Sequence, residues 1–108
     1  PPPKNWVVYY GDALPSADFK PYDTIVFDSE KHPPLAPLFY QNKNLLGYIS
    51  LGEAEDYRPY YKDLKDKNLL LKENSDWKGH YIIDVRKPEW TKYVIEKMIP
   101  DILRQGFT

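Results

Sequence analysis

Four short apolar segments, each followed at once by polar residues, constrain the fold of this chain more than any other feature of its sequence. Their residues are mainly β-branched, aliphatic or aromatic, which is typical of strands, and their near-continuous apolar character is typical of strands covered on both faces. Roughly 20 to 30 residues separate successive segments, which leaves room for crossover connections. The sequence therefore predicts an α/β fold with one parallel sheet, whose strands follow the chain order Trp6–Tyr10, Thr24–Phe27, Asn44–Leu51 and His80–Val85.

The strongest helix pattern follows the fourth of these segments. Pro88 and Glu89 suit the first turn of a helix, and Gly106 suits its C-terminal cap. Pro100 is expected to kink or divide the helix, because proline lacks an amide hydrogen and its ring crowds the preceding turn. We also expect a short helix within residues 57–72. One face of the long helix is apolar at steps of four residues, at Trp90, Val94, Met98 and Ile102.

Composition narrows the chemistry that is open to this chain. Its 108 residues suffice for at most one domain, and its formal net charge of -1 argues against a surface for nucleic acid. The absence of cysteine excludes a disulfide scaffold, a thiolate zinc site and a cysteine nucleophile. No apolar run has the roughly 20 residues of a membrane helix, and the first residues lack the basic-then-apolar pattern of a signal peptide. We interpret residues 1–5, which begin with three prolines, as a linker or the edge of a longer chain.

Several stretches, taken together and in this order, resemble glycoside hydrolase family 114. They are WVVYYGD, YDTIVFDS, GYISLGEAEDYRPYY and DWKGHYIIDVRKPEWTKYVIEKMIPDILRQGF. The resemblance implies a TIM barrel, an endo-α-1,4-polygalactosaminidase activity, an amino-sugar-rich polysaccharide as substrate and a secreted or extracytoplasmic location. A TIM barrel has eight βα units in roughly 250 residues. We therefore expect residues 6–108 to be the N-terminal half of such a barrel, truncated before its fifth strand.

The resemblance also bears on where the catalytic residues lie. Family members continue after the QGF element into a strand similar to DGVFLD, and the resemblance places a catalytic aspartate in that strand and a catalytic glutamate later. We therefore expect the reacting carboxylates beyond Thr108, while this chain carries substrate-binding residues. Because the functional face of a TIM barrel lies at the carboxyl ends of its strands, the candidates are Tyr10, Asp28, Ser50, Glu53, Asp84 and Arg86. We expect Asp28, Ser50 and Asp84 to cluster at one end of the sheet.

Most of these candidates have a structural alternative. Asp28 binds sugar hydroxyls or an amine, or it caps a helix or a turn. Asp84 and Arg86 orient a substrate or a catalytic carboxylate, or they form a structural ion pair. Glu53 reaches the cleft, or it belongs to a solvated acidic loop. The Tyr10 ring stacks on a sugar, or it packs within the fold.

Two functions of different classes remain open at this point. The first is a fragment of a polysaccharide-degrading hydrolase, and the second is a non-catalytic carbohydrate-binding or assembly module with a half-barrel fold. His32 and His80 have no second ligand at metal spacing, so we expect no metal, and the chain has no glycine-rich phosphate loop, so we expect no cofactor. The expected partners are a polysaccharide or oligosaccharide and either a second copy or a complementary C-terminal half, with no nucleic acid and no membrane.

Overall fold

A computed structural model describes residues 4–108 of the chain and divides it into two compact units. Unit 1 contains the chain up to Ile49 together with Ile99–Thr108, and unit 2 contains Ser50–Met98. Residues 1–3 of the linker predicted at residues 1–5 lie outside the described residues, while the N–H groups of Lys4 and Asn5 donate to the Asp23 carboxylate.

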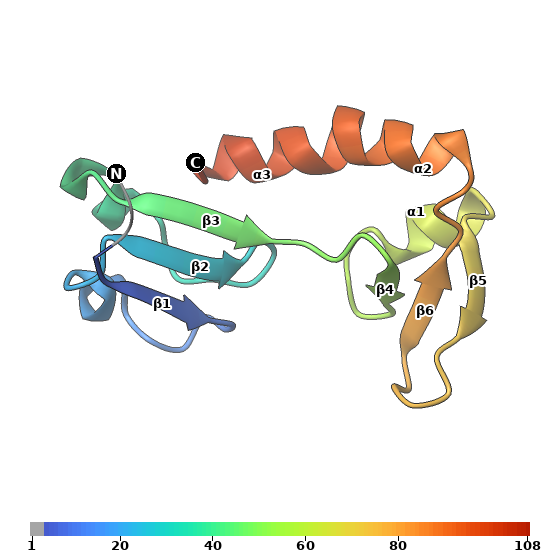
Figure 1. Ribbon diagram of the computed structural model, residues 1–108, viewed down its shortest axis with the longest axis horizontal. Helices are drawn as coiled ribbons and strands as arrows, with labels where there is room; N and C mark the ends of the chain where they lie inside the picture. The colour runs from blue at the N-terminus through green and yellow to red at the C-terminus, as the bar shows by residue number, and fades with distance from the viewer. Residues whose placement is uncertain (1–3) are drawn as a thin grey trace. The chain divides into compact units, whose positions relative to one another are not determined.

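Unit 1 is built on a parallel three-stranded sheet (Figure 1). Its strands β1 (Trp6–Tyr9), β2 (Thr24–Asp28) and β3 (Asn44–Tyr48) lie in the order β1-β2-β3, as predicted. The connections contain the short 3-10 helices η1 (Ser16–Phe19) and η2 (Ala36–Gln41). The apolar runs therefore pair in chain order, which confirms the first three strands and their direction.

The two faces of this sheet differ in burial. One face buries Ile25, Phe27 and Leu45 in a core that also contains Phe19, Leu35, Leu38 and Phe107. On the other face Trp6 is 65% exposed, Val8 46% and Leu46 42%. The prediction that the strands are covered on both faces is therefore wrong for this unit, because the apolar side chains on one face lie in contact with solvent.

The helix α3 (Ile99–Gln105) returns the chain of unit 1 to the edge of β3. Gly106 has a φ of 112° and ends this helix, as predicted for its cap. The N–H of Thr108 then donates to the carbonyl of Leu45 over 2.7 Å, and the N–H of Leu45 donates to the Thr108 hydroxyl over 3.0 Å. In a parallel strand both backbone groups of one residue point to the same side, and the neighbouring Asn44 pairs toward β2. Thr108 therefore occupies the next strand position, on the side of β3 that faces away from β2.

Unit 2 contains an antiparallel sheet in the order β4-β6-β5, formed by β4 (Glu53–Glu55), β5 (Leu70–Glu73) and β6 (His80–Ile83), with the helix α1 (Tyr61–Asp66) between β4 and β5. The short helix expected within residues 57–72 is confirmed. The prediction that residues 80–85 form the fourth parallel strand is wrong. They pair with the nearby β5 through a short connection instead, and local pairing of this kind costs less chain entropy than a distant pairing.

The helical pattern predicted from Pro88 onward is present, with an interruption. The helix α2 (Pro88–Tyr93) is followed by the π-helical turn η3 (Val94–Met98), and then by α3. Pro100 is the second residue of α3 and follows directly on η3, so residues 88–105 are helical without a gap. The π-helical turn before Pro100 interrupts the α-helical pattern, as expected near a proline, but the helix is not divided into separate helices. Trp90 and Met98 of the predicted apolar face are buried.

Candidate functional site

Three side chains lie at the carboxyl ends of the parallel strands in unit 1. Asp28 is the last residue of β2 and pairs in register with Tyr48, the last residue of β3. Tyr10 directly follows β1, and its ring lies 5.3 Å from the ring of Tyr48. The two rings thus come from the outer strands and the carboxylate from the middle strand. Both rings are accessible, with Tyr10 56% and Tyr48 40% exposed. Aromatic faces beside a carboxylate are suited to a sugar ring, which has apolar faces and polar edges.

The Asp28 carboxylate has a structural partner as well as an accessible position. Its Oδ1 accepts a hydrogen bond from the N–H of Glu30 over 3.0 Å, so it does stabilise the turn after β2. The residue is nevertheless only partly buried, in contrast to the buried Ser29 that follows it. The capping alternative is therefore present in the structure, and the role of Asp28 toward a sugar stays a prediction.

In unit 2, Asp84 and Arg86 form a bidentate ion pair. The guanidinium donates from Nε to Oδ1 over 2.9 Å and from Nη2 to Oδ2 over 3.1 Å. These hydrogen bonds hold the pKa of Asp84 below its usual value of 3.8. The Asp84 side chain is 7% exposed, whereas that of Arg86 is 81% exposed. The structural ion pair is thus confirmed, and its action on a substrate or a catalytic carboxylate stays a prediction.

Ser50 and Glu53 lie at the entry to β4. The Ser50 hydroxyl accepts a hydrogen bond from the N–H of Glu53 over 3.3 Å. The Glu53 carboxylate accepts a hydrogen bond from Nδ2 of Asn74 over 2.7 Å, and it lies 3.8 Å from Nδ1 of His80. Glu53 is therefore part of a polar cluster in unit 2 rather than of a fully solvated loop. The neighbouring Glu55 is buried and pairs with Arg58 over 3.0 Å, so its carboxylate is structural.

The structure groups the predicted residues by unit. Tyr10 and Asp28 belong to unit 1, while Ser50, Glu53, Asp84 and Arg86 belong to unit 2. The prediction that Asp28, Ser50 and Asp84 cluster at one end of a common sheet relied on a fourth parallel strand, which is absent from unit 1. Their clustering remains a prediction, and it no longer rests on a shared sheet.

Tyr48 and His80 were not among the binding candidates predicted from the sequence. The place of Tyr48 at the end of its strand, beside a polar run, was a usable signal. The contact of His80 with Glu53 depends on the antiparallel pairing of β4 with β6, which was not predicted. Among residues 4–108, no three His, Asp or Glu side chains are placed to hold a metal ion.

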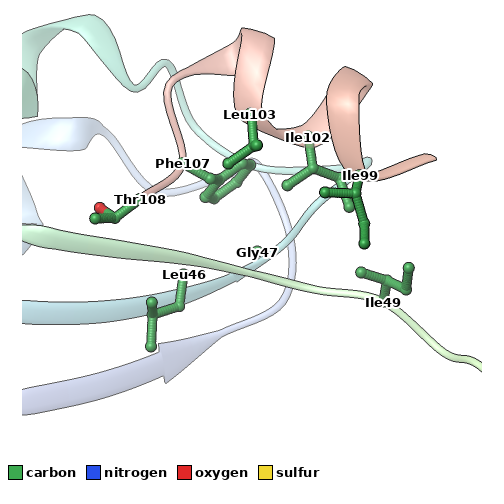
Figure 2. Close-up of a pocket in the computed structure, with 8 residues that line it drawn as sticks. All are labelled: Leu46, Gly47, Ile49, Ile99, Ile102, Leu103, Phe107 and Thr108. Carbon is green, nitrogen blue, oxygen red and sulfur yellow. The ribbon is translucent and has the colours of Figure 1, made fainter. Parts of the chain in front are cut away.

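An apolar cavity of about 240 Å³ lies between β3 and α3 of unit 1 (Figure 2). Thr108 supplies the only polar side chain among the residues that line it, and none of them is titratable. The cavity is therefore suited to another apolar element rather than to catalysis. Its lining residues are Leu46, Gly47, Ile49, Ile99, Ile102, Leu103, Phe107 and Thr108.

Solved structures share the fold of this chain. The glycoside hydrolase domain of PelA from Pseudomonas aeruginosa is 18% identical with a TM-score of 0.78, and the alignment covers 98% of this chain and 42% of that domain. Ega3 of Aspergillus fumigatus, crystallised in complex with galactosamine, is 20% identical with a TM-score of 0.73, over 95% of this chain and 41% of Ega3. These neighbours are TIM-barrel domains, so the α/β fold class with parallel strands is confirmed. Within residues 4–108 no helix has the length and apolar character to cross a membrane.

Sequence relatives of this chain include two uncharacterized proteins. An uncharacterized protein of Methanocaldococcus jannaschii is 43% identical over 57% of this chain and 18% of that protein. An uncharacterized protein of Deinococcus radiodurans is 29% identical over 91% of this chain and 35% of that protein. The chain thus spans about a third or less of these curated relatives. The sequence profile of glycoside-hydrolase family GH114 matches residues 1–108, and the chain therefore belongs to that family.

Proposed function

We propose that this chain is the substrate-binding part of a hydrolase that degrades an amino-sugar-rich polysaccharide, of the endo-α-1,4-polygalactosaminidase type. The observation that carries the proposal is the placement of Tyr10, Tyr48 and Asp28 at one edge of the parallel sheet, where aromatic faces and a carboxylate converge. The family membership supports glycosidase chemistry. The galactosamine bound to Ega3 supports an amino sugar as the substrate unit.

In this proposal the reacting carboxylates lie beyond Thr108. A retaining glycosidase needs an acid and a nucleophile roughly 5 to 5.5 Å apart, flanking the scissile bond. Asp28 is engaged with a turn and Asp84 is paired with Arg86. Because both carboxylates already accept hydrogen bonds within the fold, we assign Asp28 and Asp84 to positioning and binding rather than to general acid catalysis. An extracytoplasmic location belongs to the same proposal and is supported by the family membership.

Hydrolysis of galactosamine-rich polymer, followed by the release of reducing ends, tests the proposal. The 108-residue chain is expected to show no turnover, because the acid, base and nucleophile are missing together. A longer form that continues past Thr108 is expected to be active. If the pure 108-residue chain hydrolyses the polymer, and Asp84→Asn abolishes this activity, then the reacting residues lie within this chain and the proposal has located them wrongly. An inactive longer form that still binds the polymer would favour the alternative function of a non-catalytic carbohydrate-binding or assembly module.

A further inference from the structure

The connection between β5 and β6 in unit 2 presents an exposed indole ring. Trp77 lies in this connection and is 63% exposed. Backbone hydrogen bonds hold its position: the N–H of Trp77 donates to the carbonyl of Asn74 over 3.3 Å, and the N–H of His80 donates to the carbonyl of Trp77 over 3.1 Å. The N–H of Gly79 donates to the Glu73 carboxylate over 2.7 Å. The indole is therefore presented by a hydrogen-bonded connection between two paired strands.

Polar side chains converge next to this ring. The ring of His80 lies 5.9 Å from the ring of Trp77, at an interplanar angle of 49°. Nδ1 of His80 lies 3.8 Å from Oε1 of Glu53, whose Oε2 accepts the hydrogen bond from Asn74. The side chains of His80 and Glu53 remain 29% and 32% exposed. An indole, an imidazole and a carboxylate are thus connected by direct contacts, and all three are accessible to a ligand.

We propose that Trp77, His80 and Glu53 form a binding subsite for one cationic amino-sugar unit of the polysaccharide. This inference rests on the proposed function and adds a second binding position on unit 2. The indole face receives the apolar face of the sugar and attracts its ammonium group, since cations bind best over tryptophan among the aromatic residues. The Glu53 carboxylate accepts a charge-assisted hydrogen bond from the ammonium, and the His80 imidazole contacts a hydroxyl.

An exposed tryptophan alone does not define a site, because single apolar residues are common on protein surfaces. Tyr57 illustrates this point in the same unit, where it is 71% exposed and packs against the guanidinium of Arg58 over 5.0 Å. Trp77 differs because its ring lies 5.9 Å from that of His80, and Nδ1 of His80 in turn lies 3.8 Å from a carboxylate oxygen of Glu53. Tyr57 therefore serves as the matched control for the loss of an exposed aromatic ring.

Calorimetric titration of the chain with galactosamine oligosaccharides tests the subsite, with N-acetylgalactosamine oligosaccharides as the neutral comparison. Trp77→Ala is expected to weaken binding of the cationic sugar about five-fold, whereas Trp77→Phe retains most of the affinity. Glu53→Gln is expected to remove the preference for the cationic sugar. Tyr57→Ala is expected to leave both affinities unchanged. Circular dichroism of each variant shows that the fold is retained.

Unchanged affinity in folded Trp77→Ala would overturn the subsite, as would equal binding of the two oligosaccharides by the wild-type chain. A wild-type chain that binds neither sugar at millimolar concentration would also overturn it. These failures are distinct from failure of the proposed function, which is tested by hydrolysis of the polymer by a form that continues past Thr108. If Trp77→Ala leaves hydrolysis by this longer form unchanged, the subsite proposal is contradicted and the proposed function stands.

Discussion

The carboxylate of Asp84 accepts hydrogen bonds from two nitrogens of the Arg86 guanidinium, at 2.9 Å and 3.1 Å. One residue separates the pair along the chain, and the geometry is fork-to-fork, which is the strong arrangement for an arginine and a carboxylate. The pair holds an almost fully buried carboxylate in its charged form while most of the guanidinium faces solvent. Arg86 is therefore oriented by Asp84 and remains open to an incoming acceptor.

Replacing Arg86 should change the titration of Asp84. In Arg86→Gln the pKa of Asp84 is expected to rise from its lowered position toward or above 3.8, because the main stabilising hydrogen bonds are lost while burial remains. Arg86→Lys should rescue the pKa only in part, since an ammonium group cannot donate in the bidentate geometry. Carboxyl-detected NMR titration measures both values. An unchanged pKa in Arg86→Gln would mean that the pair does not persist in solution.

The same pair predicts a pH dependence of stability. The folded-state pKa of Asp84 is lowered, so the stabilisation is fully present above the unfolded value of about 3.8 and is lost as the pH falls through the folded value. The wild-type chain should therefore melt at a higher temperature than Arg86→Gln at pH 7. The difference should shrink in the acid range below about pH 3.8. A difference in melting temperature that does not depend on pH would contradict this linkage.

Gly106 is expected to be a sensitive position for stability. Its φ of 112° is unfavourable for any residue with a Cβ, and an added Cβ would collide with the ring of Phe39. Gly106→Ala should thus lower the free energy of unfolding by about 1 kcal/mol or more. Gly52→Ala is the matched control, because an added Cβ there meets no atom within 4 Å. Urea denaturation of both variants measures the difference, and equal destabilisation would show that the cap at Gly106 has no special role.

The first three strands were predictable because each carries a contiguous apolar run that the sheet buries on one side. Ile25, Phe27 and Leu45 are almost completely buried, and polar residues bound each run. The sequence does not show that the opposite face is exposed, since Val8 and Leu46 are as apolar as their buried neighbours. An apolar run identifies a strand, whereas the cover on each face depends on elements elsewhere in the chain.

The fourth apolar segment was assigned to the wrong sheet for a related reason. Residues 80–83 are apolar enough for a buried parallel strand, and periodicity alone does not reveal the partner or its direction. Residues 80–83 pair with the segment Leu70–Glu73. Because this segment includes the charged residues Lys72 and Glu73, its sequence is as typical of a polar helix as of a strand. Residues up to Thr108 were expected to supply four strands and to end before the fifth. Within residues 4–108 three parallel strands precede Thr108, whose N–H donates to the carbonyl of Leu45, so Thr108 lies beside β3.

Parts of the candidate site were predictable where the partners are close in sequence. Asp84 and Arg86 are two positions apart, and a structural ion pair was one of the two alternatives predicted for them. The partners Tyr10 and Tyr48 come from different strands, so their contact depends on the sheet order and could not be found from local spacing. The same limit applies to Glu53 and His80, which meet through antiparallel pairing of β4 with β6.

Tyr10 and Tyr48 should contribute to sugar binding at the edge of the parallel sheet. Tyr10→Ala and Tyr48→Ala are each expected to weaken binding of galactosamine oligosaccharides several-fold, because a stacking face is lost and its neighbour is no longer held in place. The double variant should lose less than the sum of the two free-energy changes, since the rings are in contact. Calorimetric titration measures the three affinities. Full additivity would show that the rings do not act as one platform.

The exposed face of the parallel sheet leads to the last prediction, which is self-association of the 108-residue chain. Trp6, Val8 and Leu46 leave an apolar face of unit 1 open to solvent, and contiguous patches above a few hundred Å² usually mark an interaction surface. Two such faces can pack as sheets do, about 10 Å apart. At about 25 cal/mol per Å², burial of roughly 1,000 Å² of apolar surface contributes some 25 kcal/mol, before the entropy and ordering costs of association are subtracted. A two-fold dimer is therefore expected at micromolar concentration, unless a separate C-terminal half covers the face.

Light scattering tests this prediction. The wild-type chain should have the mass of a dimer, and Leu46→Lys should have the mass of a monomer. Leu71→Lys is the control, because Leu71 is exposed on strand β5, and it should have the mass of a dimer. A stable wild-type monomer, with protected amides throughout β1, β2 and β3, would contradict the prediction, because the sheet would then tolerate its open face without a partner.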